Sequence, residues 1–133
     1  MDLVLAQEDL AQIEGCLQRV LEKSGAHDIL LVKSSGQLLC VCGDQSYEDS
    51  EAMAALAAAN FGATAAIAQM LGEERFSLLF HRGIKEHIHF APMGDDYLLV
   101  TVFDNRVSLG LIRLHAEQAT RRLIQILETV LSR

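Results

Sequence analysis

AMAALAAANFGATAAIAQMLG, residues 52–72, contains ten alanines and not one charged side chain. Its composition favours a helix, because alanine has the highest helix propensity of the amino acids. A helix on the outside of a small domain normally presents a polar face to water. This segment has almost no such face. We therefore expect protein to cover more than one of its sides.

A transmembrane span is an alternative that the length of this segment allows, since about 20 apolar residues cross a bilayer. Alanine contributes little transfer free energy, however, and Asn60, Thr64 and Gln69 interrupt the segment. We expect no membrane span. The first residues, MDLVLAQEDLAQIE, carry acids where a signal peptide is basic, which favours a cytoplasmic protein with its three cysteines reduced.

Patterns on both sides of the alanine-rich helix predict one α+β domain over residues 1–133. The expected order is helix, two strands, helix, three strands, helix, and the five strands form an antiparallel sheet. Gly36 favours a hairpin turn between the first two strands, and Ser108 is the expected cap of the last helix. The expected helices cover 7–24, the alanine-rich segment up to residue 72 with Asp49 or Ser50 as its cap and Glu51 in its first turn, and 108–133. The expected strands lie within 28–43 and at 75–82, 86–93 and 97–104.

On a helical wheel the alanine-rich segment has a side of larger residues and a side of small ones. We expect the larger side to pack on the sheet; it consists of Met53, Leu56, Asn60, Thr64, Ile67 and Leu71. We expect the small side to meet its own copy in a twofold dimer, because soluble monomers rarely expose such an apolar strip. The candidates for this interface are Ala54, Ala58, Gly62, Ala65 and Gln69. The alternative is a helix buried within one chain.

The element order, the alanine-rich second helix and the segment VSLGLIRLHAEQA at 107–119 together resemble the roadblock family. That family includes dynein light chains of the roadblock type and bacterial MglB-like regulators of Ras-like GTPases. The resemblance implies a profilin/longin-like fold and a homodimer with a continuous sheet and paired second helices. It also implies that the partner is a small Ras-like GTPase. Some MglB-like members stimulate GTP hydrolysis without inserting an arginine, and Glu51 is the sole ionisable residue of the second helix here.

Acidic residues gather before and at the start of the second helix, where they predict a negative rim for partner binding. These candidates are Asp44, Glu48, Asp49 and Glu51. The alternative is ordinary helix capping and solubility charge. The net charge of −7 disfavours a nucleic-acid partner, which requires a basic surface.

Three histidines are weak candidates for a metal site. In the hairpin around residues 83–85, we expect His81 to lie opposite His87, with His89 on the same face. We favour a solvated strand face and expect neither metal nor cofactor. Cys40 and Cys42 are interpreted as small core residues.

The sequence contains no phosphate-binding loop and no G-x-S-x-G motif, so we expect no active site of its own. Two functions remain. The first is a regulator or binding partner of a small GTPase, which includes the case of an activator that works without an arginine finger. The second is a structural adaptor with no effect on nucleotide turnover.

Overall fold

The computed structural model describes residues 5–44 and 49–132, and the order of its elements is the predicted one. β3 is shorter than predicted and begins at Leu79 rather than Arg75. The alanine-rich helix begins at Ser50, with Asp49 at the N-cap position as expected but without a side-chain cap hydrogen bond, and it ends at Met70, two residues before the end of the predicted segment. The elements are α1 (Gln7–Ser24), β1 (Asp28–Lys33), β2 (Leu38–Gly43), α2 (Ser50–Met70), β3 (Leu79–Arg82), β4 (Glu86–Met93), β5 (Tyr97–Asp104) and α3 (Leu109–Leu131).

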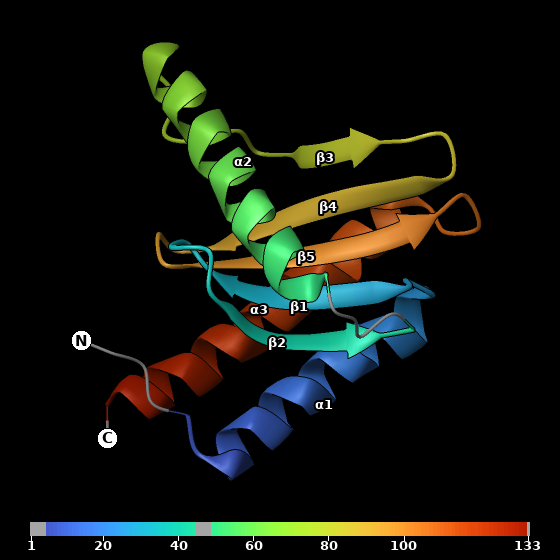
Figure 1. Ribbon diagram of the computed structural model, residues 1–133, viewed down its shortest axis with the longest axis vertical. Helices are drawn as coiled ribbons and strands as arrows, with labels where there is room; N and C mark the ends of the chain where they lie inside the picture. Colours follow the sequence, from blue (N-terminus) through green and yellow to red (C-terminus); the bar gives the residue numbers. More distant parts are fainter. Residues whose placement is uncertain (1–4, 45–48, 133) are drawn as a thin grey trace.

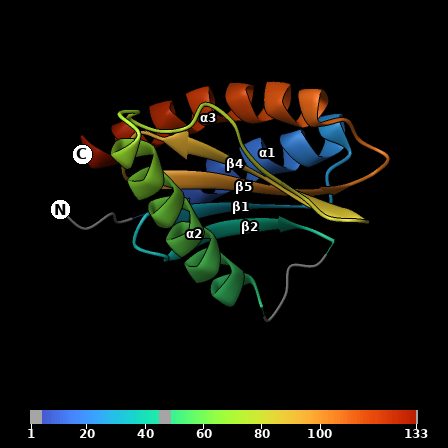
Figure 2. The same cartoon turned by 90° about the horizontal axis from the view of Figure 1, so that it is seen from above.

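The five strands form one antiparallel sheet in the order β2-β1-β5-β4-β3. β1 and β5 read as nearly continuous apolar runs because helices cover both faces of the sheet at its centre. Figures 1 and 2 show α1 and α3 side by side on one face and α2 crossing the other face obliquely. The fold therefore has three layers, with the sheet in the middle.

The α1–α3 layer forms the larger core. Ile13 and Leu17 of α1 and Leu123 of α3 are fully buried against Ile29 and Leu31 of β1. Both helices carry an apolar stripe at helical spacing and a charged outer side. The Ser108 hydroxyl accepts a hydrogen bond from the Leu111 N–H, 3.2 Å away, which confirms the predicted cap of α3.

The α2 layer forms a second, smaller core on the opposite face of the sheet. Ala54, Ala57 and Ala58 contact large side chains of the strands, among them Val32 and Leu98. Gly36, in the turn between β1 and β2, has a φ of 100° and lies so close to α2 that an added Cβ would be 3.3 Å from Ala55 Cα. Small residues on α2 therefore bring the helix close to the sheet.

Candidate functional site

α2 packs on the sheet through its small residues, and the predicted assignment of its two sides is wrong. Ala54 and Ala58, predicted at a dimer interface, are 0% and 7% exposed against the sheet of their own chain. Leu56 and Ile67, predicted to pack on the sheet, are 71% and 53% exposed. The strands already fill this space with large side chains, so complementary packing places the small residues of the helix inside.

The other three interface candidates lie along one flank of α2. Gly62 and Gln69 are exposed and Ala65 is half-buried. Together with Ala58 they line a groove between the helix and the turn at Gly94. These three residues remain accessible, but they lie beside the outermost side of the helix.

The outermost side of α2 is apolar and exposed along its length. Its large residues are Leu56, Ile67 and Met70, the last of which is 85% exposed, and alanines fill the positions between them. By length and composition α2 is also the one helix in the described ranges that could cross a membrane. In the fold, however, its inner side packs on a sheet.

An apolar groove of about 500 Å³ lies between α2 and the β3–β4 edge of the sheet. Met53 and Leu56 line one wall, and Ile88 and Phe90 line the other. His81 Nε2 lies 3.1 Å from the Asn60 amide nitrogen, which connects β3 to the helix across this groove. β3 is an edge strand that pairs only with β4 in the described residues. We call the outer side of α2, this groove and the edge of β3 the α2–β3 surface.

The family model of the Roadblock/LC7 domain matches residues 12–103. The chain belongs to the roadblock/LC7 family. Among solved structures it is similar to Myxococcus xanthus MglB, with 34% identity over 96% of each chain and a TM-score of 0.87. It is also similar to the gliding protein MglB of Thermus thermophilus, with 31% identity over 96% of this chain and 97% of that one, and a TM-score of 0.85.

An MglB with a tetrameric arrangement is 31% identical over 97% of both chains, with a TM-score of 0.90. Profilin II of Acanthamoeba castellanii is 15% identical over 84% of this chain and 96% of its own, with a TM-score of 0.59, and shows the fold alone. Comparison with curated proteins gives no match.

In this roadblock chain the acidic candidates do not form one cluster. Asp49 and Glu51 are exposed at the start of α2, at one end of the α2–β3 surface. Glu48 lies outside the described residues. Asp44 follows β2, and its carboxylate lies 3.7 Å from the His27 ring. Asp49 and Glu51 are thus the described acids of the predicted rim that border α2.

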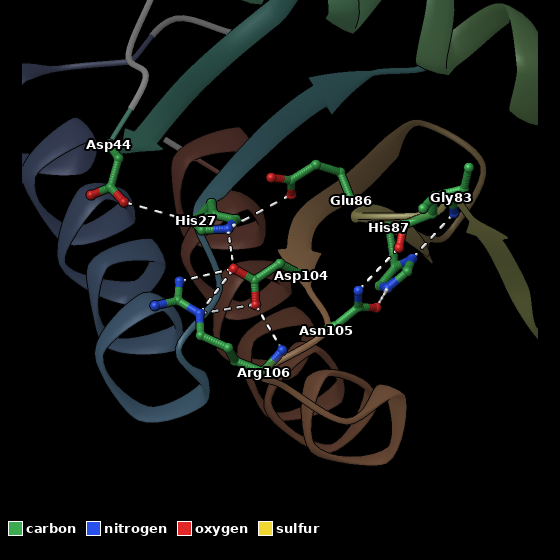
Figure 3. Close-up of polar contacts among 9 residues, drawn as sticks. His27, Asp44, Gly83, Glu86, His87, Asp104, Asn105 and Arg106 are labelled. Carbon is green, nitrogen blue, oxygen red and sulfur yellow. Dashed lines mark hydrogen bonds and ion pairs between the residues drawn. The ribbon is translucent and has the colours of Figure 1, made fainter.

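A polar cluster that the sequence analysis did not predict joins the ends of four strands (Figure 3). His27 Nε2 lies 2.7 Å from the Asp104 carboxylate, and Asp44 and Glu86 each lie 3.7 Å from the same ring. Arg106 donates to Asp104 from its side chain and its backbone N–H and, aided by His27, holds the pKa of that carboxyl well below its usual range. These mutually paired groups fasten the strand ends together.

The three histidines of the roadblock fold do not share a face, so the predicted arrangement is wrong. Arg82, not His81, lies opposite His87, and Phe80 lies opposite His89. This one-residue shift in register places His81 on the α2 side of the sheet and the other two histidines on the α3 side. His87 and His89 are each only 4% exposed, so a solvated strand face is wrong for them as well.

Each of the two buried histidines has its own environment. His87 accepts a hydrogen bond from the Gly83 N–H at Nδ1, 3.1 Å away, and its Nε2 lies 2.7 Å from Asn105 Oδ1 (Figure 3). His89 Nδ1 and Thr101 Oγ1, which face each other across β4 and β5, have no hydrogen-bond partner in the described residues. Burial, with a further contribution from Arg113, lowers the pKa of His89 to about 4.

The cysteines pack as small core residues, as predicted. Cys40 is buried and Cys42 half-buried under α1, and both are free thiols. Burial and the neighbouring Cys42 raise the pKa of Cys40 to about 12, so this thiol is unreactive at neutral pH. In the part of the chain that the structure describes, no group of three or more His, Cys, Asp or Glu side chains is placed to hold a metal ion.

Proposed function

We propose that this roadblock protein is a homodimeric regulator of a small Ras-like GTPase, and that the α2–β3 surface forms both the dimer and the partner site. The observation that carries the proposal is the exposed, uncharged outer side of α2. Leu56, Ile67 and Met70 are more than half exposed, on a helix with no charge after Glu51. Soluble monomers rarely leave such a strip uncovered.

A twofold arrangement covers this strip economically, because one patch then buries its own copy. The open edge of β3 lies beside the strip and offers backbone hydrogen bonds to a second copy. Family membership supports this arrangement, since the roadblock resemblance implies paired second helices and a continuous sheet. Similarity to MglB proteins over 96% of the chain supports a GTPase as the partner.

Light scattering of matched variants tests the dimer. Ile67→Glu places a charge on the outer side of α2, and Leu114→Glu places one on α3, where Leu114 is 50% exposed compared with 53% for Ile67. We expect the wild type and Leu114→Glu to be dimers and Ile67→Glu to dissociate, because the buried charge would have no partner. A wild-type monomer at micromolar concentration would contradict the proposal.

Binding across the twofold axis predicts one GTPase per dimer, since the first molecule blocks the second copy of the site. Titration calorimetry with a Ras-like GTPase of the same organism measures this ratio. Neutralising Asp49 and Glu51 together, by Asp49→Asn and Glu51→Gln, should slow association and reduce its salt dependence without dissociating the dimer. Two equal sites per dimer would contradict this placement.

GTP hydrolysis by that GTPase distinguishes a regulator from a structural adaptor. A regulator changes the single-turnover rate, because it holds the switch segments of the GTPase in one of their conformations. Stoichiometric binding with an unchanged rate would instead identify an adaptor.

A further inference from the structure

A groove of about 160 Å³ lies between α1 and α3, on the layer opposite α2. α1 contributes Arg19 and Lys23, which are four residues apart and so project from one side of that helix. α3 contributes His115, Gln118 and Arg122, which also share one side. Three permanent positive charges therefore surround one small hollow.

These three basic side chains have no acidic partner in the described ranges. Elsewhere in the described residues, Arg75, Arg106 and Arg113 each form an ion pair. Within the described residues, Arg19, Lys23 and Arg122 form no ion pair within 4.0 Å and make no side-chain hydrogen bond. The chain has 18 acidic and 11 basic residues, so such a grouping of unpaired basic residues is contrary to its net charge of −7. An anion bound between them would supply the opposite charge that these side chains lack.

The floor of the groove is neutral and chemically inert. Cys16 is 6% exposed, and its thiol donates a weak hydrogen bond to the Ala119 carbonyl oxygen at 3.8 Å. Burial raises the pKa of Cys16, even though Arg19 and Arg122 act in the opposite direction. Arg19 and Arg122 therefore line the groove from opposite helices, beside a buried thiol that carries no charge.

We propose that this groove is a binding site for a single phosphate group, supplied by inorganic phosphate or by a small phosphate monoester. Guanidinium groups pair bidentately with phosphate oxygens, Lys23 adds a point charge, and the Gln118 amide can donate a further hydrogen bond. The groove of about 160 Å³ admits one tetrahedral oxyanion. This site is independent of the proposed GTPase partner.

The rest of the helical layer argues for a small ligand. α1 and α3 also carry acids along their lengths, and these repel an extended anionic surface such as a membrane or a polynucleotide. The exposed acids are Glu8, Glu14, Glu22, Glu117 and Glu128. A single anionic group inserted into the groove meets the basic cluster first.

Titration of the 15N-labelled protein with inorganic phosphate, at constant ionic strength in chloride, tests the proposal. We expect saturable shifts of the Gln118, Ala119 and Arg122 amides. The double variant Arg19→Gln/Arg122→Gln should weaken binding at least about tenfold, because it removes two charge-assisted contacts. Arg121→Gln is the matched control, since Arg121 is exposed next to Arg122 and does not line the groove; its affinity should stay within about twofold of wild type.

Three results would overturn the proposal. The first is the absence of saturation up to about 10 mM phosphate, well beyond the range of a specific weak site. The second is equal weakening by Arg121→Gln, which would indicate nonspecific attraction. The third is binding to phosphatidic acid vesicles without binding of free phosphate. A parallel titration with glycerol phosphate separates the two sources: tighter binding than phosphate supports a monoester ligand, and equal or weaker binding supports inorganic phosphate.

Discussion

The two helical layers of this protein bury their faces of the sheet in opposite ways. α1 and α3 place large residues such as Leu17 and Leu123 inside and charged residues outside. α2 places alanines inside and Leu56, Ile67 and Met70 outside. The outer side of the first layer is thus mainly charged and polar, whereas the outer side of the second is mainly apolar.

The difference shows that the size of an apolar residue does not by itself reveal whether it lies on the buried or the exposed face of a helix. In α1 and α3, large apolar residues mark the core. In α2 the large apolar residues lie on the exposed side, which we propose contacts another protein, while alanines occupy the core positions. The same residue type therefore has opposite meanings on the two sides of one sheet.

Truncation of the α1–α3 core should have the largest effect. Leu123→Ala removes a side chain with 0% exposure, and the lost burial together with the remaining cavity should lower the free energy of unfolding by about 2–5 kcal/mol. Leu114→Ala, on the exposed side of the same helix, should change it by less than about 0.5 kcal/mol. Urea unfolding at one fixed protein concentration measures both. Equal losses would contradict the division of faces in this layer.

The same layer should lose stability in acid through His89. The pKa of this buried imidazole is about 4 in the folded protein against 6.5 when unperturbed, so the unfolded chain takes up the proton first as the pH falls. Stability is then fully present above pH 6.5 and declines toward pH 4, by about 3 kcal/mol in all. Unfolding measured across this range should show the decline in the wild type and a much flatter profile in His89→Leu. An unchanged slope in the variant would exclude His89 as the cause.

Enlargement of the inner side of α2 should have a moderate effect. Ala54→Leu forces extra volume between the helix and the sheet and should destabilise the protein by about 1–3 kcal/mol. Ala11→Leu, at an exposed position of α1, is the control and should be nearly neutral. Equal free energies of unfolding for Ala54→Leu and Ala11→Leu would contradict the close approach of α2 to the sheet.

Removal of surface arginines should have the smallest effect. α2 contains no arginine, so any stimulation of GTP hydrolysis should stay within about threefold when Arg82, Arg106 or Arg121 is changed singly to alanine. Arg82 is the most informative, because it lies on β3 at the edge of the proposed partner surface. Single-turnover assays of GTP hydrolysis with each variant measure this effect. A loss of about a thousandfold in one variant would identify an arginine finger.

The sequence predicted the elements well because their patterns are local. β4 and β5 were predicted with their observed bounds, and the cap at Ser108 was predicted from residue type and position. The sides of α2 were assigned wrongly, because the rule that large residues face the core ignores what the opposing sheet already fills. The prediction for His81 failed because the register of β3 on β4 differs by one residue from the one assumed, and one residue reverses the face.

The polar cluster and the basic groove could not be predicted from any local pattern. His27 and Asp104 are separated by most of the chain, and only the pairing of β1 with β5 places their elements side by side. Arg19 and Arg122 likewise meet only because α1 and α3 are adjacent in the fold. Their chemistry is apparent once the topology is known.

The uncharged outer side of α2 affects how this chain would select an identical copy over a related roadblock chain. Charged positions commonly exclude wrong partners, because like charges placed together cost several kcal/mol. The outer side of α2 offers no such repulsion after Glu51. In the proposed dimer, selection of an identical copy over another roadblock chain would therefore rest on the shapes of Leu56, Ile67 and Met70. Where several roadblock chains are made together, such a dimer surface would also allow mixed pairs.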